Sequence, residues 1–168
     1  MRRYSLVLIL ITTFAAVSFG QTTDWQKFVT PDKSCSVLLP DTPKMQTDNK
    51  DTPSGTILSD IWISKTGSAI YLVGLTTYPI DVEAKKELEL DRDNFLKAVK
   101  ATLIDSSEIT LAGRPGLEFT GTSDTYTFKS RVFYRSKRVT QIVAGERTDK
   151  FDLNAAKKFL DSFAFAGQ

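Results

Sequence analysis

The chain has 168 residues, 41% of them hydrophobic, with 22 basic and 20 acidic side chains and a formal net charge of +2. Two of the basic residues are Arg2 and Arg3, and no acidic residue precedes Asp24, so the rest of the chain carries 20 charges of each sign. This balance argues against a nucleic-acid-binding protein, which would carry a basic excess. The length suits one domain with a single core.

Residues 1–20 have the pattern of a secretory signal peptide. Arg2 and Arg3 precede an apolar run over Leu6–Val17, and Ser18-Phe19-Gly20 then leads into Gln21. The run is shorter than the roughly 20 residues of a membrane-spanning helix. We therefore expect a cleaved signal rather than an uncleaved membrane anchor, and no stable membrane span afterwards. No Cys follows to carry a lipid anchor. The prediction is a secreted or periplasmic protein, cleaved after Gly20, with one domain over residues 21–168.

The first part of that domain reads as strands around one long loop. Short strands are predicted over Trp25–Val29 and Ser34–Leu39, separated by Pro31-Asp32. Pro40–Gly55 is rich in Pro, Asp, Asn, Ser and Gly without apolar periodicity, which predicts a surface loop that is mobile or functional. A hairpin over residues 56–78 has apolar residues on both faces, which predicts a central, doubly covered position.

A long helix and a short strand are predicted next. Asp81 is a candidate N-cap for a helix over Val82–Ala101, with acidic residues towards its start and lysines near its end. Leu88, Phe95 and Val99 form its apolar stripe. A strand over Glu108–Ala112 then leads into the glycine- and proline-containing residues 113–116.

The stretch from Leu111 to Phe165 predicts three strands and a closing helix. A turn at Ser123-Asp124 would place Phe119 opposite Phe128 and Glu118 opposite Lys129. A turn at Ser136-Lys137 would place Tyr134 opposite Val139. Together the two registers predict one core face made of Leu117, Phe119, Phe128, Val132, Tyr134, Val139 and Val143.

After Asp152 the apolar period changes from two to about 3.6, which indicates a helix. Ala156, Phe159, Leu160 and Phe163 share one stripe. The predicted fold class is α+β: an antiparallel sheet of about six to eight strands flanked by helices, in an α/β/α sandwich.

The residue types that are missing exclude most catalytic chemistry. The sequence has no His, which removes the commonest general base and zinc ligand. Cys35 is the single cysteine, so we expect a buried, inert thiol; a reactive thiol or an intermolecular disulfide is the alternative. No phosphate-binding loop or dinucleotide fingerprint is present. An enzyme that relies on carboxylates alone is the third hypothesis, although no credible pair stands out. We therefore predict no enzymatic activity and no cofactor.

Four basic residues near the last predicted hairpin turn are the candidate site. Arg131, Arg135, Lys137 and Arg138 would gather there, with guanidinium groups suited to bidentate binding of an anion or an acidic partner. The alternative is that these charges only keep an exposed turn soluble. Asp48, Asn49 and Asp51 in the predicted loop would bind a hard cation weakly at most, and we favour the interpretation that they are solvated loop residues.

Three short segments resemble the PsbP-like superfamily, which includes the photosystem II extrinsic protein and the Ran-release factor. They are Ser36–Pro40 (SVLLP), Leu111–Phe119 (LAGRPGLEF) and Phe159–Phe163 (FLDSF). The resemblance implies an antiparallel sheet flanked by helices and a non-catalytic role in docking to a larger protein complex. It carries over no catalytic residues; Gly113, Gly116, Ser162 and Phe163 are similar to fold positions of the family.

These observations favour an exported, non-catalytic module that docks to a protein partner in the cell envelope. The alternative is a small-ligand or metal-ion-binding protein that uses the 40–55 loop.

Overall fold

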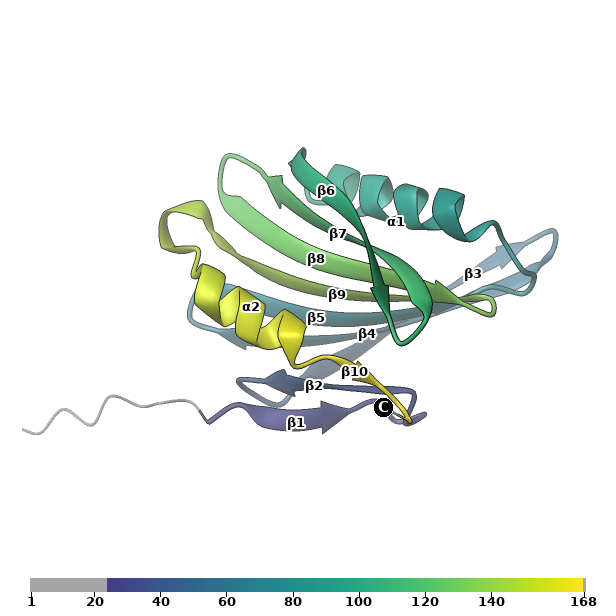
Figure 1. Ribbon diagram of the computed structural model, residues 1–168, viewed down its shortest axis with the longest axis horizontal. Helices are drawn as coiled ribbons and strands as arrows, with labels where there is room; N and C mark the ends of the chain where they lie inside the picture. The colour runs from purple at the N-terminus through teal and green to yellow at the C-terminus, as the bar shows by residue number, and fades with distance from the viewer. Residues whose placement is uncertain (1–23, 168) are drawn as a thin grey trace, which may run out of the picture.

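The computed structural model describes residues 24–167, so the predicted signal peptide lies outside the described residues. Its main element is a seven-stranded antiparallel sheet in the order β3-β4-β5-β9-β8-β7-β6 (Figure 1). The strands are β3 (Lys44–Thr52), β4 (Gly55–Thr66), β5 (Ala69–Thr77), β6 (Thr102–Leu111), β7 (Arg114–Thr122), β8 (Tyr126–Arg135) and β9 (Arg138–Arg147). The predicted α+β class with an antiparallel sheet of six to eight strands is confirmed.

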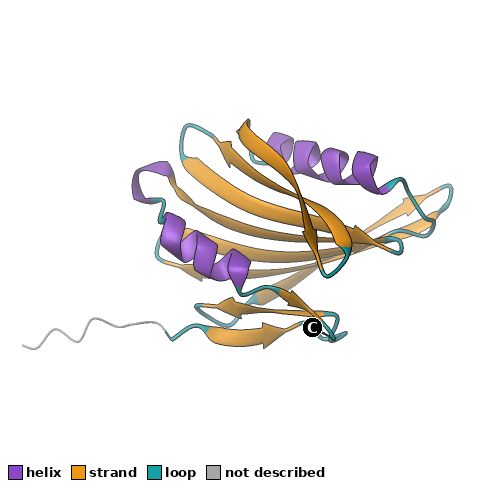
Figure 2. Ribbon diagram, viewed as in Figure 1, coloured by secondary structure: helices purple, strands orange, loops and turns teal. Residues whose placement is uncertain are grey.

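Two helices and a second, smaller sheet cover the faces of the large sheet (Figure 2). The small sheet has the order β1-β2-β10. These elements are β1 (Gln26–Val29), β2 (Cys35–Leu39), α1 (Ala84–Ala98), the 3-10 turn η1 (Thr148–Lys150), α2 (Leu153–Asp161) and β10 (Ala164–Phe165). In the described part of the chain, no helix is long and apolar enough to cross a membrane.

Alternation along β8 and β9 gives the sheet two apolar faces, because neighbouring side chains of a strand point to opposite sides. Val132 and Tyr134 pack with Leu88 and Leu96 of α1. Phe133, on the other side, packs with residues of α2 and the small sheet. The core is therefore two layers of side chains separated by the sheet. Of the seven predicted core residues, Leu117, Phe119, Val132, Tyr134 and Val139 form the α1-side cluster.

The helix α1 is shorter than the predicted 82–101 range. Its N-cap is Glu83, without a side-chain capping bond, and not Asp81. Asp81 instead accepts a hydrogen bond from the Tyr134 hydroxyl at 3.5 Å. The helix ends early because Lys100 takes a left-handed conformation (φ 53°), and the Ala101 amide returns to the Leu96 carbonyl at 2.9 Å.

The predicted 40–55 loop is wrong. Residues 44–52 form β3, which pairs residue by residue with β4, from Lys44 opposite Ile63 to Thr52 opposite Gly55. Its side chains are exposed along nearly the whole strand. An edge strand that is exposed on both faces needs no apolar alternation, so the pattern that normally indicates a strand is missing.

The predicted register between β7 and β8 is also wrong, by two residues. Phe119 lies opposite Ser130 and Glu118 opposite Arg131. Thr122 pairs with Thr127, so four residues separate the paired positions instead of the two expected at Ser123-Asp124. A shift by two preserves which face each side chain occupies, and the core face survives. The β8–β9 register, with Tyr134 opposite Val139, is confirmed.

The closing helix α2 agrees with its predicted stripe. Ala156, Phe159 and Leu160 are buried. Asp152 caps the helix by accepting hydrogen bonds from the amides of Asn154 and Ala155. After the helix, the Ser162 hydroxyl accepts a hydrogen bond from the Leu38 amide at 2.9 Å, which ties the helix end to β2.

Candidate functional site

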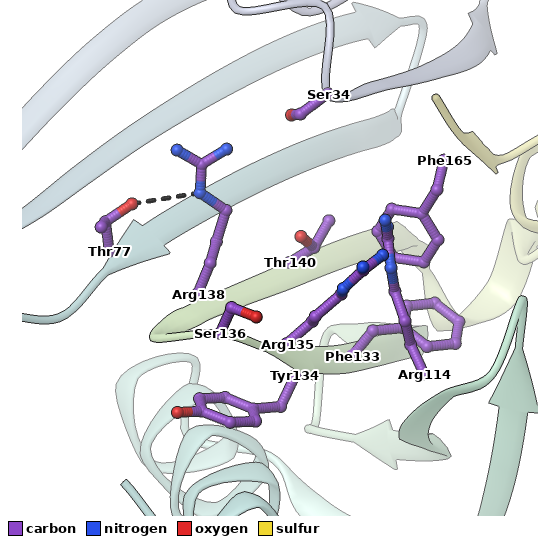
Figure 3. Close-up of a pocket in the computed structure, with 10 residues that line it drawn as sticks. All are labelled: Ser34, Thr77, Arg114, Phe133, Tyr134, Arg135, Ser136, Arg138, Thr140 and Phe165. Carbon is purple, nitrogen blue, oxygen red and sulfur yellow. Dashed lines mark hydrogen bonds between the residues drawn. The ribbon is translucent and has the colours of Figure 1, made fainter. Parts of the chain in front are cut away.

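A pocket of about 280 Å³ lies between the small sheet and one end of the large sheet, next to the β8–β9 turn (Figure 3). Three arginines from three strands contribute to its wall, together with hydroxyl and aromatic side chains. The lining residues are Ser34, Thr77, Arg114, Phe133, Tyr134, Arg135, Ser136, Arg138, Thr140 and Phe165. We call this site the arginine pocket.

Strand register brings the three arginines together. Arg135 and Arg138 are the pair that closes the β8–β9 hairpin. On β7, Gly116 pairs with Phe133, and two residues further along each strand Arg114 and Arg135 reach neighbouring positions. Directly opposed residues of neighbouring strands point to the same face. The three guanidinium groups therefore share the face that α2 and the small sheet cover.

Arg114 is held by an aromatic ring. Its guanidinium carbon lies 3.5 Å from the centre of the Phe165 ring, a cation–π contact. Phe165 in turn packs edge-to-face against Phe133 and Phe163, with ring centres 5.5 and 4.9 Å away. The Arg114 Nε atom is buried and has no hydrogen-bond partner among the described residues. The pKa of Arg114 is lowered, mainly by burial and secondly by the charge of Arg135.

Arg135 and Arg138 differ in how their charges are compensated. Arg138 donates to Asp32 at 2.6 Å and to Thr77 at 3.2 Å. Arg135 is exposed and forms no ion pair within residues 24–167. In Figure 3 its guanidinium lies beside that of Arg114 near the Phe165 ring, whereas Arg138 reaches towards Thr77. The pocket thus holds two adjacent cations that no described carboxylate neutralises.

The other two predicted site residues lie outside the pocket. Arg131 donates to Glu118 at 2.6 Å and to Asp161 at 2.7 Å, so two carboxylates neutralise it. Its Nη1 also donates to the Leu160 carbonyl at 3.0 Å, which fixes α2 on the sheet. Lys137, in the turn, donates to the Pro79 carbonyl at 3.3 Å. Only Arg135 and Arg138 of the predicted set come together.

Outside the pocket, Glu118 neutralises two basic residues of β8, Lys129 and Arg131. It binds Lys129 at 2.8 Å as well as Arg131. Burial alone would raise the pKa of Glu118, but the hydrogen bonds from Lys129 and Arg131 outweigh burial and lower it. The predicted Glu118–Lys129 pair therefore exists, as a diagonal contact rather than a directly opposed one.

Arg114 was missed because of the β7–β8 register. In the predicted register it would lie opposite Phe133, not beside Arg135. The four-residue β7–β8 loop shifts the register by two residues and brings Arg114 beside Arg135. In the sequence, Ser123 indicates this loop, because its hydroxyl accepts a hydrogen bond from the Tyr126 amide at 3.0 Å. A Ser that bonds the backbone three residues on is a turn feature that sequence reasoning can recognise.

The remaining candidate residues do not converge on a site. Asp48, Asn49 and Asp51 lie on the exposed edge strand β3, where Asp51 accepts a hydrogen bond from Thr56 at 2.7 Å. The described residues contain no group of three or more Cys, Asp or Glu side chains placed to hold a metal ion. Cys35 is buried beside Thr30, and burial raises the pKa of its thiol.

Comparison with known proteins finds similarity in structure alone. No family model and no curated protein sequence matches the chain. The solution structure of cyanobacterial PsbP (CyanoP) from Synechocystis sp. PCC 6803 superposes with a TM-score of 0.58 at 12% sequence identity. The match covers 90% of this chain and 98% of that one. The chain therefore has the PsbP-like fold that its sequence resemblance implied.

Proposed function

We propose that the protein is an exported, non-catalytic module that docks to an acidic segment of a protein partner in the cell envelope. One observation carries this proposal: Arg114 and Arg135 lie side by side, and no described carboxylate neutralises either of them. Elsewhere on the same face, Arg131 and Arg138 each have a carboxylate partner.

Two adjacent like charges destabilise a folded protein unless something compensates them. A carboxylate placed between two guanidinium groups would compensate both and would accept their planar N–H donors in pairs. The contact with Phe165 holds Arg114 in place and so reduces the entropy lost on binding. The alternative, a small-ligand or metal-ion-binding protein, depended on a 40–55 loop, but residues 44–52 of that range form strand β3. The proposal therefore rests on the arginine pocket.

The proposal is tested with a fluorescent peptide of eight glutamates and its octaglutamine counterpart, using fluorescence anisotropy at low salt. The octaglutamate is expected to bind and the octaglutamine not to bind. Arg135→Gln is expected to weaken binding by at least about tenfold, since a hydrogen bond to a charged group contributes about 1.5–3 kcal/mol. Binding should also weaken as salt is added.

Arg147→Gln is the matched control, because Arg147 lies at the far end of β9 and pairs with Asp149 on the surface. It should leave peptide binding unchanged. Equal losses for Arg135→Gln and Arg147→Gln would show a general charge effect and would contradict the proposal. A partner retained from the host's envelope fraction by the natural protein, and released by Arg135→Gln, would identify the physiological target.

A further inference from the structure

We infer that the arginine pocket is half of a two-part site, and that the partner segment is an extended peptide with two anchors. An acidic side chain enters the arginine pocket, and a large apolar side chain enters a second pocket beside it. This inference rests on the proposed function and specifies the chemistry of the partner.

The second pocket is a hollow of about 200 Å³ with an exposed apolar rim. Met45 and Leu58, on the two outermost strands of the sheet at that edge, are 51% and 50% exposed. Its lining residues are Pro31, Asp32, Met45, Leu58, Asp60, Trp62, Leu75, Thr77 and Arg138. Half-exposed Met and Leu side chains around a hollow favour the binding of an apolar side chain.

The two pockets are neighbours on one face. Thr77 and Arg138 line both of them. Strand pairing places Leu58 opposite Thr77, Thr77 opposite Arg138, and Arg138 opposite Arg135, a single row across four strands. At about 4.8 Å between strands, Leu58 and Arg135 are roughly 14 Å apart. An extended peptide advances about 3.3 Å per residue, so anchors four residues apart would reach both pockets from one side of the peptide.

Charge sets which anchor enters which pocket. Asp60 and Asp32 both line the second pocket. Arg138 neutralises Asp32 through an ion pair of 2.6 Å, and Asp60 accepts a hydrogen bond from Thr47 at 2.9 Å. Asp60 forms no ion pair among the described residues, so its charge would repel an acidic side chain, whereas the uncompensated Arg114 and Arg135 attract one. The acidic anchor is thereby confined to the arginine pocket, and the neutral apolar anchor to the second pocket.

The test uses the capped peptide Glu-Thr-Ser-Thr-Leu and its reversed sequence, titrated into the purified protein and followed by amide chemical shifts in NMR. One order is expected to bind and to shift resonances around both pockets. Replacing the peptide's Glu by Gln, or its Leu by Ser, is expected to weaken binding about tenfold each. The first change removes a hydrogen bond between charged groups, and the second removes the burial of a large apolar side chain.

Leu58→Ser in the protein supplies the second half of a double-mutant cycle. This substitution is expected to weaken binding of the Leu-containing peptide about tenfold and to leave binding of the Ser-containing peptide unchanged. Leu90→Ser is the matched control, because Leu90 is 48% exposed but lies on α1. If the Glu is required but neither the peptide's Leu nor Leu58 matters, the two-anchor inference is overturned and the proposed function stands. If the Gln peptide binds as tightly as the Glu peptide, both fail.

Discussion

Gly116 shows how closely the backbones around the arginine pocket are packed. A Cβ atom at this position would lie 2.5 Å from the Val132 carbonyl oxygen and 2.6 Å from the Phe133 ring. Neither neighbour can move freely, since one is backbone of β8 and the other is a core ring. We expect Gly116→Ala to destabilise the protein by about 2 kcal/mol, as overpacking commonly does. Urea unfolding followed by circular dichroism measures this change.

Gly74→Ala is the control for Gly116→Ala. Gly74 is also a strand glycine, but its added Cβ would find its nearest atoms at 3.6 and 3.8 Å, an ordinary contact distance. The free energy of unfolding of the Gly74→Ala variant should differ from that of the natural protein by less than about 1 kcal/mol. Equal destabilisation by both substitutions would mean that the lost glycine, and not the close approach to β8, is responsible.

The turn between β8 and β9 sets the position of Arg135 and Arg138. Its two central residues, Ser136 and Lys137, both have positive φ, 47° and 67°. Two-residue hairpin turns with this geometry favour Asn-Gly, because non-glycine residues there cost about 1–2 kcal/mol each. We expect the double change Ser136→Asn, Lys137→Gly to raise the free energy of unfolding by about 1 kcal/mol, measured by thermal and urea unfolding.

Lys137→Ala separates turn geometry from the loss of the lysine side chain. It removes the Lys137 hydrogen bond to Pro79 but keeps a Cβ in the left-handed conformation. No stabilisation is expected from it. If Lys137→Ala stabilises as much as the double change, the lysine side chain itself is unfavourable there, and the argument from turn geometry fails.

Elements whose residues alternate clearly could be predicted from the sequence, and elements defined by loops or edges could not. The β4–β5 hairpin, β8, β9 and α2 follow from periodicity, because each buries one or two apolar faces. The edge strand β3 buries nothing, so no pattern marks it. The β7–β8 register depends on a four-residue loop held by the Ser123 hydroxyl, and this loop brings Arg114 to Arg135. Of the four predicted site residues, Arg135 and Arg138 lie in one pocket, because a two-residue turn leaves little freedom of register between them.

Across the whole molecule, two carboxylates respond to pH in opposite ways. Burial alone would raise the pKa of Asp32, but hydrogen bonds from Ser34, Thr30 and Arg138 outweigh it and lower the pKa from 3.8 to about 2. Stability from Asp32 is therefore present above pH 3.8 and lost as the pH falls towards 2. Because Asp32 links the small sheet to β9 through Arg138, acid weakens the contact between the two sheets.

Asp91 acts in the opposite direction. One of its carboxylate oxygens is buried without a hydrogen-bond partner among the described residues. The pKa of Asp91 is raised from 3.8 to about 7, mainly by burial and secondly by the charge of Glu87. Between these two pKa values the folded state keeps a proton on Asp91 that the unfolded state releases. The contribution of Asp91 to the free energy of unfolding is therefore complete below pH 3.8 and is lost as the pH rises to 7.

The two effects together predict greatest stability near pH 4, with a decline towards neutral pH that Asp91→Asn removes. A neutral amide does not ionise on burial, so the variant should be more stable than the natural protein at pH 8, by up to about 4 kcal/mol, and not at pH 4. Urea unfolding at both pH values measures the difference. Asp93→Asn, on the same helix but ion-paired to Arg92 at the surface, should keep the decline. A decline that persists in Asp91→Asn would place its cause in other groups and would show that the buried carboxylate reaches water in the folded protein.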